Sequence, residues 1–284
     1  MSDLSLIKEL REKTGAGFLD CKNALSENNN NIEQSIDSLR KKGIAKATKK
    51  SSSEANEGAI GFYKNENISV ILKINSETDF SAKSDTFLDF LDFIGDIALN
   101  TNNPNLNLND FLNTEDNGKT VSDLLTEMIA KIGENLIIND LKVYNNKDAK
   151  VNYYVHNPYR KNIGKIISAV FYSSKEENDD VKNFSKSLCM HIAASKPEAM
   201  DIDNLPAELI ENEKKIQEEM IKDSGKPSNV MEKILEGKMK KFYSEVTLLN
   251  QNFVIDTDKT VKEAISDFNS SNNLILNNYI LISL

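Results

Sequence analysis

The sequence predicts an α+β fold with a two-part core of small antiparallel sheets backed by helices. Three features lead to this class. Apolar residues recur at helical spacing over residues 1–42, which predicts a small helical unit. Further on, two alternating apolar runs, a helical run and a returning apolar run occur in succession, and this layout appears twice. A charged helical excursion over residues 205–235 interrupts the second occurrence and predicts an inserted antiparallel helical hairpin.

The N-terminal residues 1–42 predict three short helices. The segment Thr14–Gly17 ends the first helical pattern, because glycine is a common helix stop. Asn28–Asn31 forms the turn before the third helix. Each helix has one apolar face, and these faces comprise Leu4, Ile7 and Leu10, then Phe18, Cys21, Ala24 and Leu25, and finally Ile32, Ile36 and Leu39.

Residues 43–57 are predicted as a linker, within a stretch from Arg40 to Glu57 that is first basic and then serine-rich. Two interpretations are open for this stretch. It is either a solvated tether, with or without a short helix, or an arm that contacts RNA. The tether is favoured, because the basic residues have no interleaved aromatic residues and the chain as a whole is acidic.

The first half of the core is predicted over residues 58–148. It contains a hairpin, two helices and a returning strand. In chain order, the predicted elements are strands Ala59–Tyr63 and Ile68–Asn75 with a turn at Asn65–Asn67, a helix with Phe87, Leu91, Ile94 and Ala98 on one face, a helix over Val121–Lys131, and a strand over Leu136–Tyr144.

The second half of the core is predicted over residues 149–204 and 236–284. In chain order, its elements are strands Val151–His156 and Lys165–Tyr172, a helix over Val181–Ala194, a third strand over Glu245–Ile255, and a short helix with Val261, Ala264, Ile265 and Phe268. The apolar tail Leu274–Ile282 has two interpretations, a final strand or an exposed edge that needs cover.

The hairpin over residues 205–235 is predicted to turn at Gly225–Pro227. Each of its helices has a single apolar stripe. This stripe is buried within the hairpin, against the domain or against another subunit, and the first two arrangements are the simpler ones.

The composition excludes several classes of protein. The chain has 284 residues and a net charge of −9, and sequence-independent nucleic-acid binding depends on basic charge. No apolar run is long enough for a membrane helix, and Met1–Leu4 begins neither a signal nor a transit peptide. The distant cysteines Cys21 and Cys189 fit a reducing compartment. We therefore expect a cytoplasmic protein with no direct nucleic-acid binding and no membrane binding.

The sequence offers little for covalent catalysis. It contains no glycine-rich phosphate loop, no nucleophile elbow and no zinc-protease motif. Of the two histidines, His191 has helical spacing with Leu188 and Ala194, which predicts a partly buried structural residue. His156 stands alone at the end of a predicted strand, without a nucleophile or a metal cluster. We expect no enzyme activity, no catalytic residue, no metal and no cofactor.

The segment Ile74–Ala82 places a carboxylate beside a bare aromatic ring at the tip of a short connection. An alternating strand pattern stops at Ile74, and a helical pattern begins shortly after Ala82. An exposed Phe80 at such a tip has nothing to bury against. Its ring is therefore either folded back or offered to a partner.

Several stretches of the sequence resemble the bacterial elongation factor Ts family. Leu10–Leu25 resembles the N-terminal signature of that family, and Ile74–Phe80 resembles its second signature, the Thr-Asp-Phe motif. Further similar stretches follow in family order over nearly the full length, and they comprise Lys131–Asn135, Met190–Pro197, Ser224–Pro227 and Glu236–Phe242.

The resemblance implies a guanine-nucleotide exchange factor without covalent chemistry. Such a factor binds elongation factor Tu in its GDP-bound and nucleotide-free forms, disturbs its Mg2+ and phosphate site, and promotes GDP release during translation elongation. The resemblance also implies a ubiquitin-associated-like helical domain at the N-terminus that binds the GTPase. It implies, further, that the hairpin over residues 205–235 can mediate dimerisation, as a homodimer or in a two-plus-two complex, and the oligomeric state stays open.

By position, the resemblance assigns partner contacts to three groups of residues. Thr78, Asp79 and Phe80 form the exchange loop, of which Asp79 and Phe80 would enter the GTPase near its Mg2+ and phosphate site. Ile132, Gly133 and His156 would line the same contact, and Arg11, Phe18 and Leu19 would touch a helix near the guanine side. Ordinary core packing is the alternative for Phe18, Leu19 and Ile132.

Three departures from the family pattern stand out. Ser81 replaces the usual valine, which is expected to soften the support behind Phe80. The loop Asn157–Asn162 is longer than the family's glycine-rich turn, which makes the assignment of His156 less secure. The chain ends at Leu284, where some relatives have a further helix, so part of the partner contact is expected to be missing.

Overall fold

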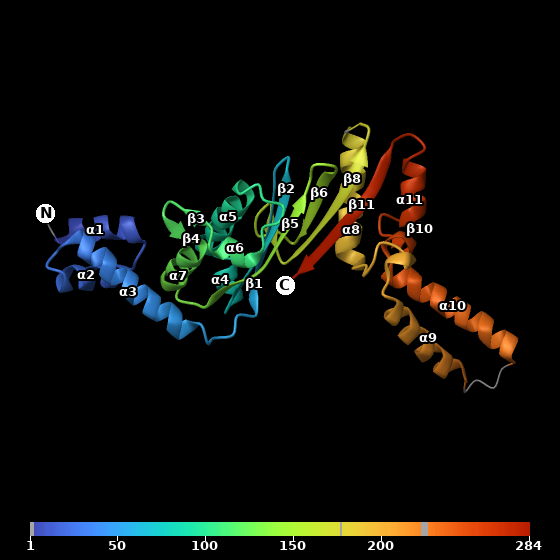
Figure 1. The fold of residues 1–284 in the computed structure, drawn as a ribbon, viewed down its shortest axis with the longest axis horizontal. Helices are drawn as coiled ribbons and strands as arrows, with labels where there is room; N and C mark the ends of the chain where they lie inside the picture. The colour runs from blue at the N-terminus through green and yellow to red at the C-terminus, as the bar shows by residue number, and fades with distance from the viewer. Residues whose placement is uncertain (1–2, 177, 223–226) are drawn as a thin grey trace. The chain divides into compact units, whose positions relative to one another are not determined.

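The computed structural model describes residues 3–176, 178–222 and 227–284, and it divides into two compact units (Figure 1). Unit 1 contains the chain up to Asn145, together with Pro158–Lys165 and Leu284, and unit 2 contains Asn146–Asn157 and Ile166–Ser283. Both units combine helices with small antiparallel sheets, which confirms the α+β class. The finer division into five segments stays a prediction.

The N-terminal part of unit 1 consists of helices α1 (Asp3–Thr14), α2 (Phe18–Glu27) and α3 (Ile32–Lys50). Their boundaries follow local backbone preferences. Gly15 adopts a left-handed conformation at φ 65° directly after α1, where glycine has no steric penalty. The Asn31 side chain accepts a hydrogen bond from the Gln34 amide and thereby caps α3. A small core holds the helices together, and its buried members are Ile7, Leu10, Cys21, Ala24 and Leu25.

Helix α3 continues through much of the predicted linker. Residues 43–50 are helical, which agrees with the interpretation that this stretch includes a helix, and the boundaries of the linker stay a prediction. Helix α3 contacts α7 (Val121–Ile132) in unit 1. At Gly43 a Cβ atom would lie 3.1 Å from the Ala130 Cβ, so the two helices approach closely. Sequence periodicity missed this extension because the segment is highly charged and its packing partner lies far along the chain.

The sheet of unit 1 has the strand order β5-β2-β1-β7. The predicted hairpin is confirmed as β1 (Glu57–Lys64) and β2 (Ile68–Ser76), which pair antiparallel. The Asn65 side chain accepts hydrogen bonds from the Asn67 and Ile68 amides and closes the turn between them. Strand β5 (Leu136–Asn145) pairs with β2 as expected. The short strand β7 (Ile163–Gly164) was not predicted.

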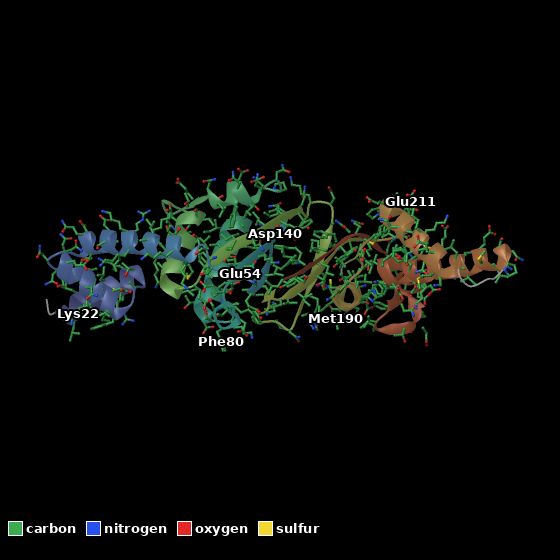
Figure 2. All side chains as sticks on the ribbon, turned by 90° about the horizontal axis from the view of Figure 1, so that it is seen from below. Lys22, Glu54, Phe80, Asp140, Met190 and Glu211 are labelled. Atoms are coloured by element: carbon green, nitrogen blue, oxygen red, sulfur yellow. The ribbon has the colours of Figure 1, made fainter. Side chains whose placement is uncertain are left out.

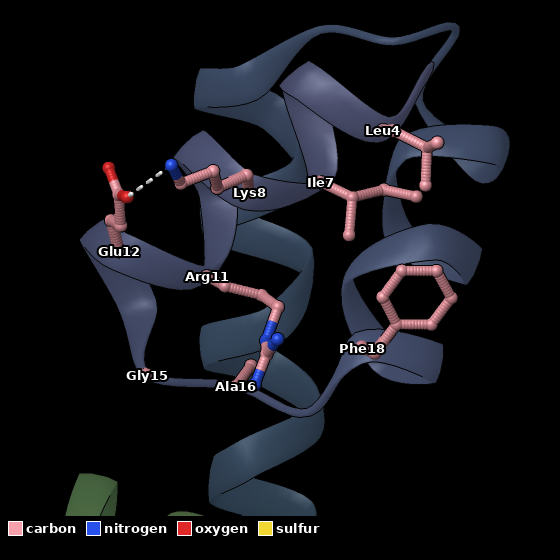
Figure 3. Close-up of a pocket in the computed structure, with 8 residues that line it drawn as sticks. All are labelled: Leu4, Ile7, Lys8, Arg11, Glu12, Gly15, Ala16 and Phe18. Atoms are coloured by element: carbon pink, nitrogen blue, oxygen red, sulfur yellow. Dashed lines mark ion pairs between the residues drawn. The ribbon is translucent and has the colours of Figure 1, made fainter.

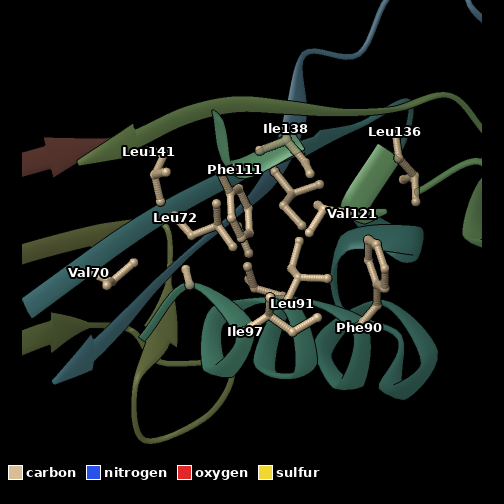
Figure 4. Packing of buried hydrophobic residues seen from close by; sticks show 14 of the residues in the cluster. Val70, Leu72, Phe90, Leu91, Ile97, Phe111, Val121, Leu136, Ile138 and Leu141 are labelled. Carbon is tan, nitrogen blue, oxygen red and sulfur yellow. The ribbon is translucent and has the colours of Figure 1, made fainter. Parts of the chain in front are cut away.

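Helices cover this sheet and complete the core of unit 1. The expected helix is α5 (Asp85–Asn100), and its apolar face packs on β1 and β2 (Figure 4). The second expected helix, α7, begins with a capping box formed by Thr120 and Asp123. Four short elements were not predicted, and they are α4 (Asp79–Ala82), α6 (Leu108–Leu112), β3 (Glu115–Asp116) and β4 (Lys119–Thr120).

A single tyrosine ring fixes how α5 lies on β1. The Tyr63 hydroxyl donates to the Leu91 carbonyl oxygen at 3.0 Å and lies 3.2 Å from an Asp92 carboxylate oxygen. A Cβ atom at Gly95 would lie 2.2 Å from the ring, and one at Gly61 would lie 2.4 Å from the hydroxyl oxygen. Burial raises the pKa of Tyr63 above its ordinary value. The ring therefore occupies space that these two glycines leave open.

Unit 2 contains a sheet with the strand order β11-β8-β6. The predicted hairpin is confirmed as β6 (Lys150–His156) and β8 (Ile166–Ser174). The helices α8 (Asp179–Ser195) and α11 (Val261–Phe268) are also confirmed. Buried side chains from the sheet, from these helices and from residue 248 form a second core, which includes Val170, Tyr172, Leu188, Ile192 and Leu248.

The predicted third strand at Glu245–Ile255 is wrong. Helix α10 runs to Val246, and the region then contains the 3-10 turn η2 (Leu248–Asn250) and the short strand β9 (Asn252–Phe253), which pairs with β10 (Asp256–Thr260). Leu248 is buried in the 3-10 turn and Phe253 in β9, whereas Val254 and Ile255 are exposed. The sheet's third strand is the tail itself, β11 (Leu274–Ser283), which pairs with β8 and forms an edge. Of the two interpretations of the tail, the final strand is therefore confirmed.

The predicted hairpin of unit 2 consists of α9 (Ala207–Lys222) and α10 (Ser228–Val246), which contact each other. The short 3-10 turn η1 (Ile202–Asn204) precedes it. Residues 225 and 226 of the predicted turn lie outside the described residues. Helix α10 continues well beyond residue 235, the predicted end of the hairpin. Within the described ranges, every helix is too short or too polar to cross a lipid bilayer.

A substitution of Gly95 tests the contact of Tyr63 with α5. We expect Gly95→Ala to lower the free energy of unfolding by about 1–3 kcal/mol, because the new methyl group overlaps a buried ring whose hydroxyl is hydrogen-bonded to Leu91. Urea denaturation followed by circular dichroism measures the change. Gly237→Ala is the matched control, because nothing lies within 4 Å of the added Cβ and alanine favours a helix by about 0.5–1 kcal/mol. Equal effects of the two substitutions would contradict the proposed clash.

A buried hydroxyl in α4 provides a second test. Ser81 is 7% exposed, and its hydroxyl has no hydrogen-bond partner within the described residues. We expect Ser81→Ala to raise the free energy of unfolding by about 1 kcal/mol, because an unsatisfied buried polar group is removed. Ser84→Ala should lower it by about 1 kcal/mol, because the Ser84 hydroxyl accepts from the Phe87 amide and caps α5. A loss of stability in Ser81→Ala would contradict this account.

Candidate functional site

The strongest candidate site is the tip between β2 and α5 in unit 1, where Phe80 is 84% exposed (Figure 2). Helix α4 begins at this tip, and the Thr78 side chain caps it by accepting from the Ser81 amide at 3.2 Å. Of the two alternatives for the ring, the structure shows the exposed one. An aromatic side chain this exposed gains little by burial within its own chain.

The backbone that carries Phe80 is held by the turn after α7. The Thr78 amide and hydroxyl donate to the two carboxylate oxygens of Glu134, at 3.1 Å and 2.8 Å. Both bonds are made to a charged acceptor, which is the stronger class of hydrogen bond. The tip is therefore fixed one residue before Asp79, although its own side chains stay exposed.

The Glu77 carboxylate makes a second set of hydrogen bonds that hold the tip. Its carboxylate accepts the Asn135 amide at 2.6 Å and the Lys50 ammonium at 3.1 Å. The hydrogen bond from the Asn135 backbone N–H is the main reason why the pKa of the Glu77 carboxyl lies below its ordinary value. The buried Asn135 side chain donates in turn to the Ser53 carbonyl oxygen at 2.7 Å.

Asp79 pairs with a lysine on its own helical turn. The Lys83 ammonium lies 2.8 Å from an Asp79 carboxylate oxygen and 5.9 Å from the centre of the Tyr159 ring. The hydrogen bond from Lys83 keeps the pKa of the Asp79 carboxyl below its ordinary value. The Asp79 carboxylate is thus charged and oriented, but it remains accessible.

Ile132 and Gly133 lie at the C-terminal end of α7, directly before Glu134. Gly133 adopts a left-handed conformation at φ 85°, which ends the helix and turns the chain toward the tip. Ile132 is partly buried against the core of unit 1, so packing accounts for part of its role. The structure therefore brings these two predicted residues next to the segment that holds Thr78.

The N-terminal helices form a second candidate surface. An open groove of about 420 Å³ has an apolar side with Leu4, Ile7 and Phe18, and a charged side with an ion pair between Lys8 and Glu12 (Figure 3). Its remaining lining residues are Arg11, Gly15 and Ala16.

Two predicted residues of these helices are exposed rather than buried. The exposed fractions are 46% for Phe18 and 65% for Leu19, which contradicts the alternative of core packing for both. Arg11, which was predicted with them, is also exposed.

His156 lies at the end of β6 in unit 2 and is exposed. The Tyr154 hydroxyl lies 3.3 Å from its Nδ1 atom. In the altered loop that follows, Arg160 binds carboxylates of α5 in unit 1, with distances of 2.6 Å to Asp89 and 2.8 Å to Asp92. This anchoring was not predicted.

His191 is a structural residue of unit 2 and is completely buried, rather than partly buried as predicted. Its Nδ1 atom accepts the Val254 amide at 3.2 Å, so its Nε2 atom is the donor to the Gln251 side chain at 3.0 Å. Burial lowers the pKa of His191 and keeps the ring neutral. In the part of the chain that the structure describes, His, Cys, Asp and Glu side chains form no group of three suited to a metal ion.

Sequence reasoning found the exposed tip but missed the residues that hold it. Glu77, Glu134 and Asn135 all lie within the motif stretches, yet their roles depend on contacts between segments far apart in the chain. The one signal that could have identified them was the presence of carboxylate and amide side chains in both stretches. Lys50 had been grouped with a basic linker.

Comparison with known proteins identifies the family. The family model described as Elongation factor TS matches residues 77–281. A protein named Elongation factor Ts from Allorhizobium ampelinum is 40% identical over 265 residues, which cover 93% of this chain and 85% of that relative. Proteins of the same name from Rhizobium etli and Rhizobium meliloti are 40% and 39% identical, and each alignment covers 94% of this chain and 87% of the relative. The chain therefore belongs to the elongation factor Ts family.

Proposed function

We propose that this protein is a guanine-nucleotide exchange factor that binds GDP-bound elongation factor Tu, disturbs its Mg2+ and phosphate site and promotes GDP release. As a member of the elongation factor Ts family, the chain is an elongation factor of protein biosynthesis. It acts in the cytoplasm, where translation takes place, and it performs no covalent chemistry.

The exposed ring of Phe80 on a braced tip is the observation that carries this proposal. Phe80 is 84% exposed, while the neighbouring backbone is held by Glu134 and Glu77. A rigid aromatic side chain enters a partner's pocket at a low entropic cost. Asp79 would bring its negative charge to the same place, where it opposes the phosphates of the nucleotide.

Exchange follows from thermodynamic linkage. A factor that lowers the affinity of the GTPase for GDP must itself bind the GDP-bound form more weakly than the nucleotide-free form, by the same factor. Mg2+ requires near-octahedral coordination, so a small displacement of its surroundings weakens its binding and with it that of the phosphates.

The ring alone supplies only part of this coupling. Burial of one Phe side chain contributes about 1.5–3 kcal/mol, which corresponds to about one to two decades of affinity. Further surfaces must hold the complex, and the exposed Arg11, Phe18 and Leu19 of the N-terminal helices are the proposed ones, with Ile132, Gly133 and His156 as further contacts.

An interaction scaffold without an exchange role is the alternative function. The groove on the N-terminal helices would support binding in that case, whereas the exposed tip would have no role. Self-association through α9 and α10 stays a prediction, for which the exposed Ile216 and Met220 provide an apolar surface.

The first experiment measures GDP release from the cognate elongation factor Tu, with and without the protein. We expect acceleration at micromolar concentrations and expect Phe80→Ala to reduce the maximal rate about tenfold to a hundredfold, because the buried ring is lost. Phe93→Ala is the matched control, since Phe93 is a 43% exposed ring on α5, away from the tip. Wild-type rates in Phe80→Ala would remove the tip from the mechanism, and no acceleration by the wild type would contradict the proposed function.

Calorimetry distinguishes the exchange factor from the scaffold. The protein is titrated into GDP-loaded and nucleotide-free elongation factor Tu under the same conditions. We expect binding to the nucleotide-free form to be at least about tenfold tighter, because linkage requires it. Equal affinities for both forms would favour the scaffold.

A further inference from the structure

Four basic residues of α3 contact acidic or carbonyl groups of unit 1, namely Arg40, Lys42, Lys46 and Lys50. Lys42 lies 2.7 Å from a Glu27 carboxylate oxygen, and Arg40 lies 3.7 Å from one of Asp123. Lys46 donates to the Ala130 carbonyl oxygen at 3.1 Å. These contacts weaken the interpretation of this stretch as an RNA-binding arm, because Arg40 and Lys42 are each paired with a carboxylate.

Two of these contacts attach α3 to α7. Arg40 and Lys46 reach the beginning and the end of α7, and Gly43 lies between them in the chain, where an added Cβ atom would lie 3.1 Å from the Ala130 Cβ. A glycine permits this close packing because it has no Cβ atom. Helix α3 is thus fixed along α7, and α7 ends at the turn that holds the tip.

The end of α3 reaches the same tip directly. Lys50, the last residue of the helix, lies 3.1 Å from a Glu77 carboxylate oxygen. The side chains of this pair are 34% and 21% exposed, so the pair is partly shielded from water. Just beyond the helix, the Ser53 carbonyl oxygen accepts from Asn135, whose amide donates to Glu77. Lys50, Glu77 and Asn135 therefore form one connected network directly before Thr78.

We propose that Lys50 and Glu77 are positioning residues that couple the N-terminal helices to the Phe80 tip, so that both surfaces approach the GTPase as one rigid element. This inference rests on the proposed function. Neither residue belongs to the surfaces that were assigned to the partner contact. Their role is to hold the backbone from which Phe80 projects, in a fixed relation to Phe18 and Leu19.

The coupling has a defined physical effect. When two binding surfaces are held together rigidly, binding of the first raises the effective concentration of the second at its own pocket. If the connection loosens, the N-terminal helices still bind GDP-loaded GTPase, but Phe80 reaches its pocket less often. The maximal rate of GDP release then falls, while the concentration that gives half of this rate changes little.

The test compares three variants of the full chain. Lys50→Met removes the ion pair and keeps the length of the side chain, Lys50→Arg keeps the charge, and Lys49→Met removes the same charge from the exposed neighbouring residue. We expect Lys50→Met to reduce the maximal rate of GDP release about threefold to fivefold, the size of a well-placed ion pair. Lys50→Arg and Lys49→Met should retain the rate of the wild type.

Hydrogen exchange of the protein alone provides an independent readout. The Asn135 amide donates to Glu77, so its exchange should be faster in Lys50→Met than in Lys49→Met. A purely structural role would instead reduce the amount of folded protein, which raises the half-saturating concentration and leaves the maximal rate unchanged.

The outcomes separate the inference from the function on which it rests. If the wild type does not accelerate GDP release, the proposed function fails and the inference fails with it. If the wild type is active and Lys50→Met has the same maximal rate as Lys49→Met, only the coupling is overturned. A raised half-saturating concentration with an unchanged maximal rate also overturns it. A lower maximal rate with faster exchange at Asn135 supports it.

Discussion

An aromatic ring that stands on the surface cannot hold its own backbone in place, because it has no packing within its chain. In unit 1, charge-assisted hydrogen bonds to the residues next to Phe80 hold the backbone of the tip in place. Glu134 accepts two bonds from Thr78, and Glu77 accepts the Asn135 amide at 2.6 Å. The position of Phe80 therefore depends on these polar contacts together with the buried Ala82 of the same helix. The left-handed Gly133 is part of the same arrangement, because it directs Glu134 and Asn135 toward the tip.

The contacts of its lysines show that α3 is attached to unit 1, although its composition suggests a solvated linker. A run of lysines followed by serines is typical of a solvated linker, yet Lys46 and Lys50 both bind groups of unit 1. Individually these exposed or half-exposed contacts are weak. Their effect comes from their distribution along one helix, since they fix its orientation at several points. Such a series of contacts fixes the orientation of the helix but contributes little to stability.

Much of the fold could be predicted where the pattern was local and strongly periodic. The β1–β2 hairpin, with Asn65 in its turn, and the amphipathic α5 follow directly from their own residues. The errors arose where contacts with residues far away in the sequence determine the secondary structure. β7 is a strand only because β1 lies beside it. The sequence left the final strand β11 open between two interpretations, and the apolar stretch before β10, which was predicted as a strand, contains a 3-10 turn instead. For the site, the sequence showed a bare Phe80 on a short connection. That Glu77 and Glu134 hold this connection could be seen only in the folded chain, because their partners lie far apart in the sequence.

The topology also governs when each unit can be completed during synthesis. The sheet of unit 1 acquires its edge strand β7 only when Ile163 and Gly164 have been made, long after the paired strands β1 and β2. The sheet of unit 2 acquires β11 only after residues 274–283 have been made, since β8 pairs with them up to Ser283. Until then, one side of β8 has no strand beside it. Such unpaired strand edges are prone to wrong pairing, so the nascent second unit is vulnerable between the synthesis of β8 and that of β11.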